Sequence, residues 1–449
     1  GLQSRLTLGG ELTARVYIET YGCALAEFES CIMEEVLRAR GFEVVSDVSL
    51  ADVIVVNTCA VRLDTEQKIA KRLLELRKSR SNARFVVTGC LAKARPGLVI
   101  RVVPEASLLA PQAVERVAEA VNTALAGSKL IVLDCERDTS RAPPLRPQEA
   151  VGTVMIQEGC LNECSFCITK LARPKLKSYP INVVVDMVRR LVEQGAVEIR
   201  LTGMDVGAYG ADLSDKPTLA DLLREVLDKV EGDYLIRIGM MTPESALETI
   251  DDLLDVYRDS RVYKYFHIPV QTGDDRLLKI MGRKYSVEDY KELYKKIKNR
   301  FPDAVVATDI IVGHPGEDEK SFEKTVELLL ELRFEKVHIA QYTIRPHTKA
   351  SVLPQVSDSV KKERSTKLSK LVESICYEKL SRYKSREVVA RVVEIGFRKE
   401  SLIARLENYV PVVLRGGKEL LRKRVRVLIE DNTFFDLRGK VIEVLMNRI

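Results

Sequence analysis

Three cysteines, Cys160, Cys164 and Cys167, stand within the fourteen-residue stretch QEGCLNECSFCITK. Three thiols at this spacing could share an iron or zinc ion, form a disulfide, or be neighbours by chance. The chain contains nine cysteines, an odd number, and its N-terminus GLQSRLTLGGEL lacks the apolar core of a signal peptide. This combination predicts reduced thiols inside the cell, so metal binding or catalysis is favoured over a disulfide framework.

A second set of cysteines follows three short β-branched runs. Cys23, Cys59 and Cys90 come shortly after residues 15–18, 52–56 and 84–87, respectively. If these runs are parallel strands, their carboxyl ends lie along one sheet edge, where open α/β sheets bind ligands. The three thiols would then converge, and three thiolates leave one iron of a four-iron cluster without a protein ligand. The alternative is that each cysteine is packed as a small hydrophobic residue, which is the interpretation preferred for Cys31, Cys135 and Cys376.

The elements that must position the second set alternate between strand and helix. Amphipathic stretches between the three runs predict a doubly wound α/β domain with a parallel sheet over residues 1–142. Pro143, Pro144 and Pro147 in the following segment RAPPLRPQEA indicate a linker.

A second alternation predicts a (βα)6 partial barrel over residues 143–378. Its expected strands are residues 153–156, 197–202, 234–238, 263–269, 305–312 and 336–343. Barrels of this type carry their chemistry at the carboxyl ends of the strands, and the triad Cys160, Cys164 and Cys167 follows the first of them.

Residues 379–449 change to short strands without intervening helices, which predicts a small all-β barrel. Residues 380–449 contain sixteen lysines or arginines against nine aspartates or glutamates, a surplus of +7, while the whole chain has a net charge of +6. A basic module on a near-neutral body favours a nucleic-acid partner. Arg422, Arg424 and Arg426 are expected to share one face of a strand and bind RNA, the alternative being a charged edge strand that prevents aggregation.

The composition is that of a soluble globular chain of 449 residues, with 46% hydrophobic and 30% charged residues. No apolar run approaches the roughly 18 residues that a membrane span requires. We therefore expect a cytoplasmic protein of several domains without a membrane partner.

The spacing C-x3-C-x2-C differs from that of bacterial ferredoxins and from paired C-x2-C zinc sites. At the first strand of a six-stranded partial barrel, it resembles the radical S-adenosylmethionine superfamily. The resemblance implies that Cys160, Cys164 and Cys167 hold a 4Fe–4S cluster whose open iron chelates S-adenosylmethionine, and that Phe166 shields the cluster from water. One electron from the cluster then cleaves the sulfonium and gives a 5′-deoxyadenosyl radical.

Further motifs narrow the resemblance. The segments TYGC, NTCAVR and TGCLAK, the central GCLNECSFCITKLAR and the basic C-terminal barrel together resemble the methylthiotransferases, most closely the archaeal and eukaryotic enzymes acting on N6-threonylcarbamoyladenosine in tRNA. The terminal barrel would be a TRAM domain. The resemblance implies a second 4Fe–4S cluster on Cys23, Cys59 and Cys90, catalysis by Cys160, Cys164 and Cys167 through their cluster, the tRNA anticodon stem-loop as substrate, and an unidentified electron donor and sulfur source.

The resemblance also assigns residues near the strand ends to the S-adenosylmethionine pocket: Gly203, Asp205, Arg237, His267, Gln271 and Asp309. Arg345 and His347 in the RPHT turn are expected to face the substrate. The chain departs from the family pattern at Ala26 and Glu29, where Asn and Asp are usual, at Pro174, where Gly is usual, and at His314 and His347, where Phe and Gly are common. These departures affect substrate geometry rather than the chemistry, since all six cysteines are kept.

Two alternatives remain open from the sequence. The same chemistry could act on isopentenyl-adenosine in tRNA or on an aspartate of a ribosomal protein. A catalytically silent iron–sulfur protein that binds RNA or carries electrons is also possible, but this hypothesis leaves the barrel motifs unexplained.

Overall fold

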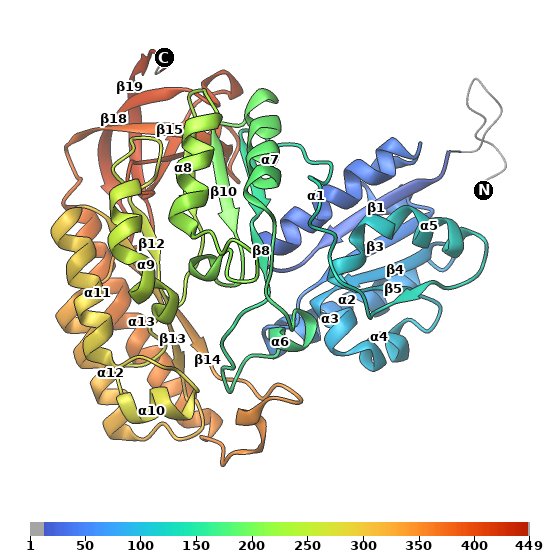
Figure 1. Ribbon diagram of the computed structural model, residues 1–449, viewed down its shortest axis with the longest axis horizontal. Helices are drawn as coiled ribbons and strands as arrows, with labels where there is room; N and C mark the ends of the chain where they lie inside the picture. The colour runs from blue at the N-terminus through green and yellow to red at the C-terminus, as the bar shows by residue number, and fades with distance from the viewer. Residues whose placement is uncertain (1–12, 448–449) are drawn as a thin grey trace.

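The computed structural model describes residues 13–447, so the N-terminal stretch on which the signal-peptide interpretation rested lies outside the described residues. Figure 1 shows a parallel sheet covered by helices, a half-barrel beside it, and a small barrel at the C-terminal end. Across the described residues, none of the helices combines the length and apolar character that crossing a membrane requires.

The first domain is a six-stranded sheet in the order β2-β1-β3-β4-β5-β6, with all strand pairs parallel. Its strands are β1 Arg15–Thr20, β2 Glu43–Val45, β3 Val53–Thr58, β4 Arg84–Gly89, β5 Ser107–Leu109 and β6 Ile131–Val132. The central strand β3 is buried throughout, because both faces of the sheet are covered by helices.

Alternate residues of β3 pack against different helices. The covering helices are α1 Ala24–Ala39, α2 Leu63–Ser79, α3 Cys90–Ala94, α4 Pro96–Val102 and α5 Val117–Leu125. Val53 and Val55 belong to the core shared with α1 and α5, whereas Ile54 and Val56 pack with α2 and α4. The predicted doubly wound α/β domain is therefore confirmed.

The second domain is a half-barrel of six parallel strands. These are β7 Val151–Met155, β10 Glu198–Thr202, β11 Leu235–Ile238, β12 Tyr265–His267, β13 Val305–Val312 and β14 Lys336–Gln341. They form two three-stranded sheets, β7-β10-β11 and β12-β13-β14, which are joined by isolated parallel bridges at Ile236 with Val262 and Met240 with His267. The six strands and their order agree with the (βα)6 prediction.

Helices cover the outside of the half-barrel, and all but the last of them connect its strands (Figure 1). They are α7 Ile181–Glu193, α8 Leu219–Lys229, α9 Pro243–Val256, α10 Asp275–Ile280, α11 Val287–Arg300, α12 Glu319–Leu332 and the long α13 Asp358–Ser381. Both α8 and α11 begin with a complete capping box, formed by Thr218 with Asp221 and by Ser286 with Asp289. After β7, the chain forms the short antiparallel pair β8 Gln157–Glu158 and β9 Lys177–Ser178, which brackets the cysteine loop and the short helix α6 Thr169–Ala172.

The C-terminal strands form a closed barrel in the order β15-β16-β17-β19-β18. They are β15 Glu387–Ile395, β16 Ser401–Arg405, β17 Pro411–Arg415, β18 Arg424–Asn432 and β19 Leu437–Leu445. Tyr263, Tyr265 and Val305, at the beginnings of half-barrel strands, share one core with this barrel. The barrel therefore closes the half-barrel at the end where its strands begin, opposite the end that carries the cysteine loop.

The sequence did not predict β2, β5, β6, β8, β9 and β19. The first five are only two or three residues long, and β19 has an irregular burial pattern with Gly439 in its interior, so it lacks the alternation that identifies a strand. The boundaries after residues 142 and 378 stay predictions; residue 142 lies in an irregular segment and residue 378 lies within α13.

Candidate active site

The three central cysteines lie together in the loop between β8 and α6. Charges on Cys164 and Cys167 both act on Cys160, which places the three thiols within electrostatic range of one another. Burial raises the pKa of Cys160 to about 11 and also raises that of Cys164, although the Arg283 guanidinium opposes the second shift. Burial thus disfavours bare thiolates in this loop, and positive charge nearby is needed to stabilise them.

The loop is fixed by contacts with distant parts of the half-barrel. The amide of Ser165 donates to the carbonyl of Met281 at 2.9 Å, and the Ser165 carbonyl accepts from Ala350 at 2.8 Å. Nη1 of Arg283 lies 2.7 Å from Sγ of Cys164, while its Nη2 pairs with Glu244 at 2.9 Å. The guanidinium of Arg283 therefore supplies one of the positive charges that the thiols require.

His314, one of the departures from the family pattern, also holds this loop. Its Nδ1 lies 2.8 Å from the carbonyl of Pro315, which can only accept, so Nδ1 carries the proton. The neutral ring then accepts at Nε2 from the hydroxyl of Ser165 at 2.9 Å. Burial lowers the pKa of His314, which favours this neutral form, and its ring packs edge-on to Phe166 with centroids 6.0 Å apart.

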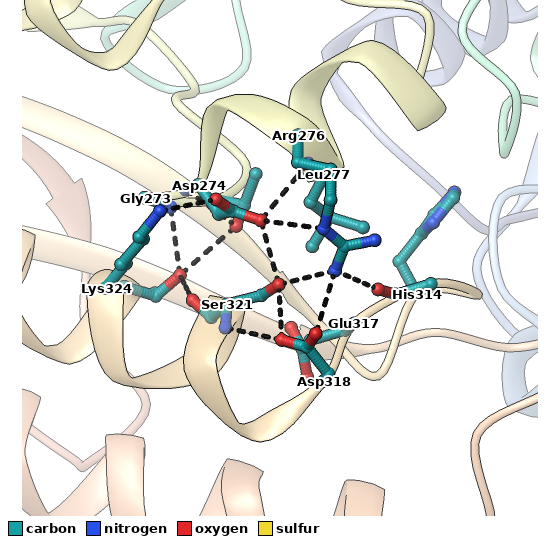
Figure 2. Close-up of polar contacts among 12 residues, drawn as sticks. Gly273, Asp274, Arg276, Leu277, His314, Glu317, Asp318, Ser321 and Lys324 are labelled. Carbon is teal, nitrogen blue, oxygen red and sulfur yellow. Dashed lines mark hydrogen bonds and ion pairs between the residues drawn. The ribbon is translucent and has the colours of Figure 1, made fainter.

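A polar network at the start of α10 and α12 holds the segment that carries His314. Figure 2 shows Asp274 accepting from the Ser321 hydroxyl and from Lys324, while Arg276 contacts Ser321 and Asp318. The ring of His314 points away from this network in the same view. Arg276 also donates to the carbonyl of Gly316 at 2.7 Å, so the network fixes the turn that follows His314 and leaves the imidazole free to contact the cysteine loop.

The three N-terminal cysteines converge at the carboxyl edge of the first sheet, each after a different strand. Cys23 precedes α1, Cys59 follows β3, and Cys90 is the first residue of α3. Charge on Cys23 acts on both Cys59 and Cys90, so the three thiols lie near one another. Gly89 has a φ of +94°, and a Cβ there would lie 2.4 Å from the carbonyl of Thr58, so only glycine permits this placement of Cys90.

All nine cysteines are free thiols. Within residues 13–447, no three His, Cys, Asp or Glu side chains are arranged to hold a single metal ion. The donor chemistry of each triad nevertheless suits an iron–sulfur cluster, which is bound by cysteine thiolates. Burial raises the pKa of Cys90 to about 12, so its thiolate also requires positive charge, which iron ions would supply.

A buried ion network connects the two cysteine regions across the domain interface. Glu29 on α1 accepts from Arg173, which follows α6, with Nη1–Oε1 at 2.7 Å and Nη2–Oε2 at 2.9 Å. Nη1 of Arg173 also contacts Glu158 at 2.7 Å, and Arg137 contacts both Glu29 and Glu158. All four side chains are buried, and the charge of Arg173 also acts on Cys90. This Glu29 network therefore joins the Cys90 side of the first domain to the segment that follows the central cysteine loop.

A second buried contact joins the domains at Cys59. Arg345, which follows β14, donates through Nε to the carbonyl of Ala60 at 3.1 Å and through Nη2 to Glu66 on α2. Only 2% of Arg345 is exposed, so the expectation that it faces the substrate is wrong. Glu66 binds the guanidinium in place of solvent or substrate. His347 is exposed beside Arg95, Pro96 and Arg101, and its role stays a prediction.

Asp205 and Gly203 lie at the carboxyl end of β10. The buried carboxylate of Asp205 accepts from the amide and hydroxyl of Thr242 at 2.9 and 2.8 Å and from the hydroxyl of Ser245. These contacts join β10 to the start of α9. A Cβ on Gly203 would lie 2.2 Å from Oε1 of Gln157, so glycine is required for Gln157 to occupy this position.

His267 and Asp309 form a pair on the inner face of the half-barrel, with Nε2 and Oδ1 2.9 Å apart. Gln271 has a φ of +72°, and its buried Oε1 lacks a hydrogen-bond partner within the described residues. Cζ of Arg237 lies above the rings of Tyr265 and Tyr409, 6.0 and 5.6 Å from their centroids. These residues share the inner face, and their assignment to the S-adenosylmethionine pocket stays a prediction.

The prediction that Arg422 shares one strand face with Arg424 and Arg426 is wrong. Strand β18 begins at Arg424, whereas Arg422 precedes it with a φ of +73°. The guanidinium of Arg422 donates to the carbonyls of Gly195 and Glu149, both at 2.8 Å, and thereby holds the barrel against the half-barrel. Arg424 donates to the carbonyl of Met446, and Arg426 pairs with Glu443 at 3.0 Å.

The sequence missed the roles of Arg283, Glu29 with Arg137, and Glu66. Glu29 departs from the family pattern, but nothing in the sequence indicated its partner. Sequence patterns reveal local spacing, whereas Glu29 and Arg173 are 144 residues apart and Arg345 and Glu66 are 279 apart. The departures from the family pattern at Glu29 and His314 were the one signal in the sequence that pointed to any of the contacts around the cysteines.

Comparison with known families divides the chain into the same three parts. Residues 15–110 match the uncharacterized protein family UPF0004, residues 154–329 match the radical SAM superfamily, and residues 381–442 match the TRAM domain. The chain has the half-barrel and cysteine loop of the radical SAM superfamily, which implies a 4Fe–4S cluster and S-adenosylmethionine as cofactors.

Curated relatives extend this similarity over almost the whole chain. A probable threonylcarbamoyladenosine tRNA methylthiotransferase from Pyrococcus abyssi is 39% identical over 407 residues, which cover 90% of this chain and 94% of the relative. A protein of the same description from Archaeoglobus fulgidus is 38% identical, covering 95% of this chain and 98% of the relative. The chain belongs to the threonylcarbamoyladenosine tRNA methylthiotransferase family.

Among solved structures, the radical S-adenosylmethionine methyltransferase TsrM from Kitasatospora setae has a similar fold. Its TM-score is 0.57 at 16% identity, with 76% of this chain and 77% of that chain covered. At this identity the likeness supports the fold alone.

The Glu29 network generates a stability prediction. In Glu29→Gln, two buried arginines share the single carboxylate of Glu158, so the free energy of unfolding should fall by about 3–5 kcal/mol. Urea unfolding followed by circular dichroism measures this change. Glu75→Gln is the control, because Glu75 is exposed and lies 3.9 Å from Lys71; it should change stability by less than about 0.5 kcal/mol. Equal effects of the two substitutions would contradict the structural importance of the network.

Proposed function

We propose that this protein is a tRNA methylthiotransferase that replaces the C2–H bond of N6-threonylcarbamoyladenosine in the anticodon loop by a C–SCH3 bond. The observation that carries the proposal is the pair of cysteine triads, one in each of two domains, connected by the buried contacts of Glu29 and Arg345. The activity named for relatives at 38–39% identity over at least 90% of this chain supports the same reaction.

Cys160, Cys164 and Cys167 would hold the radical-generating cluster, and Cys23, Cys59 and Cys90 would hold a second cluster. When bound, the first cluster and S-adenosylmethionine supply a radical that removes the hydrogen, and the second presents sulfur that a further S-adenosylmethionine methylates. The protein's own part is positional. Arg283 and the neutral His314 fix the central loop, and Arg173 and Arg345 fix the first domain relative to it.

The substrate adenosine must leave the anticodon loop to enter the half-barrel. Single-stranded loops permit this because their bases are unpaired, so unstacking one base costs only a few kcal/mol. An electron donor and a sulfur source are also required, and a tRNA substrate implies a cytoplasmic location. Mass spectrometry of tRNA nucleosides from cells with and without the gene tests the product; absence of the 2-methylthio derivative only in the deleted strain is expected.

Iron content tests the two cluster sites. Anaerobic reconstitution should give about eight irons per chain, because each triad would ligate a four-iron cluster. Replacing Cys160, Cys164 and Cys167 together by Ala should leave about four irons, measured by colorimetric iron and sulfide analysis. Replacing Cys31, Cys135 and Cys376 is the matched control and should leave about eight. Unchanged iron in the first triple variant would disprove the central site.

The two triads should also have separable activities. The Cys160, Cys164 and Cys167 variant should not cleave S-adenosylmethionine. Replacing Cys23, Cys59 and Cys90 by Ala should preserve release of 5′-deoxyadenosine but abolish the methylthio product, because the sulfur-presenting site is removed. Chromatography of both products under reducing, oxygen-free conditions makes the measurement. Loss of cleavage in both folded variants would argue against the division.

The basic C-terminal barrel should contribute to tRNA affinity through phosphate contacts. Changing Arg424 and Arg426 to Ser should weaken tRNA binding and flatten its salt dependence, by roughly 0.7 in the slope of log K against log salt for each lost contact to single-stranded RNA. Anisotropy titrations over a salt series measure both quantities. Arg422→Ser is the comparison, because Arg422 contacts the half-barrel; it should alter domain docking more than the salt slope. An unchanged affinity and slope in the double variant would show that Arg424 and Arg426 do not bind tRNA.

A further inference from the structure

The inner face of the half-barrel carries two cations, Arg237 on β11 and Lys336 on β14. Lys336 and His338 are two residues apart on β14 and therefore share a face. That face is the inner one, because the ring of His338 stacks on His267 with centroids 5.6 Å apart. Arg237 reaches the same region, since its charge and that of Lys336 act on each other.

Neither cation forms an ion pair with a carboxylate within residues 13–447. Arg237 lies over the rings of Tyr265 and Tyr409, and its buried Nε has no hydrogen-bond partner in the described part of the chain. Nζ of Lys336 lies 5.5 Å from the ring centroid of Phe435. Aromatic faces attract a cation but do not neutralise its charge. The inner face therefore has positive charge available for an anionic ligand.

Neighbouring charges add to this effect. Burial lowers the pKa of Lys336 to about 8, and the charges of Arg405 and Arg237 act in the same direction, while the carboxylate of Asp309, which pairs with His267, opposes them in part. Arg200, by contrast, pairs with Glu198 at 2.9 Å and Glu394 at 2.7 Å. An anion beside Lys336 would raise its pKa back toward the ordinary value, whereas a neutral ligand would leave the repulsion in place.

The two cations lie deeper than the reacting end of the half-barrel. Lys336 pairs with Ala307, and Asp309, which pairs with His267, is two residues further along β13. Two residues of a strand span about 7 Å, so Lys336 is one layer further from the cysteine loop than the His267–Asp309 pair. A ligand bound at the strand ends would reach the cations only through a side group of several bonds.

We propose that Arg237 and Lys336 bind the free carboxylate of the threonylcarbamoyl group and thereby select this adenosine. The inference rests on the proposed function. The carboxylate ends a side group several bonds beyond the purine ring, which matches the deeper position of the cations. In the radical SAM superfamily the carboxylate of S-adenosylmethionine is held by the open iron, which leaves the threonylcarbamoyl carboxylate as the anion that the modified base itself carries.

The same cations exclude the competing neutral substrate. An isopentenyl group would cover Arg237 and Lys336 without offering an acceptor, and a site built to bind a polar group strongly disfavours an analogue that lacks it. Both cations are half-buried, and a cation left there without its partner loses the free energy of a charge-assisted hydrogen bond. Arg237 thus changes from a predicted S-adenosylmethionine contact to a determinant of substrate specificity.

The test compares two anticodon stem-loop RNAs that differ in one group. One carries threonylcarbamoyladenosine, and the other carries the same nucleoside with its carboxylate converted to a carboxamide. Binding to the reconstituted holoenzyme is measured by fluorescence anisotropy at constant salt. The parent protein should prefer the carboxylate by about ten- to a hundredfold, the range of a charge-assisted hydrogen bond.

Lys336→Met should reduce this preference by about tenfold or more, whereas Lys336→Arg should keep most of it because the charge remains. Lys295→Met is the matched control, since Lys295 is exposed on the outer helix α11, and it should keep the parent's preference. Equal binding of both RNAs by the parent would overturn the proposal. An equal loss for both RNAs in Lys336→Met would indicate a phosphate contact instead, and a loss of S-adenosylmethionine affinity alone would indicate that cofactor's carboxylate.

Methylthiolation of the carboxylate RNA by the parent separates the two possible failures. Product formation without discrimination between the RNAs would overturn only the assignment of Arg237 and Lys336. Absence of product under conditions where S-adenosylmethionine is cleaved would overturn the proposed function and, with it, this inference.

Discussion

The contact between Glu29 and Arg173 is the interaction on which the arrangement of the two cysteine triads depends. Glu29 belongs to the helix that begins after Cys23, and Arg173 follows the loop that contains Cys160, Cys164 and Cys167. A buried ion pair is a poor general source of stability, because desolvation offsets most of its Coulombic energy, but it tolerates little change in geometry. This bidentate pair of hydrogen bonds, reinforced by Glu158 and Arg137, therefore fixes one domain relative to the other. The proposed chemistry, shared between two clusters, would require this kind of fixed separation.

The interface has a second attachment point, and the two differ in what they hold. Arg345 contacts the carbonyl of Ala60, the residue directly after Cys59, and so fixes the backbone at a proposed cluster ligand. Arg173 acts instead on the side of Cys90. Through Arg345 and Arg173, the half-barrel contacts two of the three strand ends that carry the N-terminal thiols. Glu29 and His314, which depart from the family pattern, likewise hold the segments that carry the cysteines, and the cysteines themselves are unchanged.

The C-terminal barrel contributes to the half-barrel as well as to the basic surface. Tyr409 packs against Tyr263 and Tyr265 at the beginning of the strands, and its hydroxyl lies 3.3 Å from the buried carboxylate of Glu198. This packing closes the half-barrel at the end where its strands begin and places Arg237 over an aromatic surface. The C-terminal barrel thus provides the surplus of positive charge and also packs against the proposed carboxylate site.

The sequence by itself determined the three-part architecture, because β-branched runs, amphipathic helices and short barrel strands each have a local period. It also determined the convergence of Cys23, Cys59 and Cys90, since parallel strands bring their carboxyl ends to one edge whatever their separation in sequence. Only the tertiary structure decided that Arg345 contacts Glu66 and not the substrate, that Arg422 docks on Gly195 and Glu149, and that Arg237 and Lys336 lack carboxylate partners within the described residues. The physical reason is that the partner of a long charged side chain is set by packing between distant segments, and no local period in the sequence carries that information.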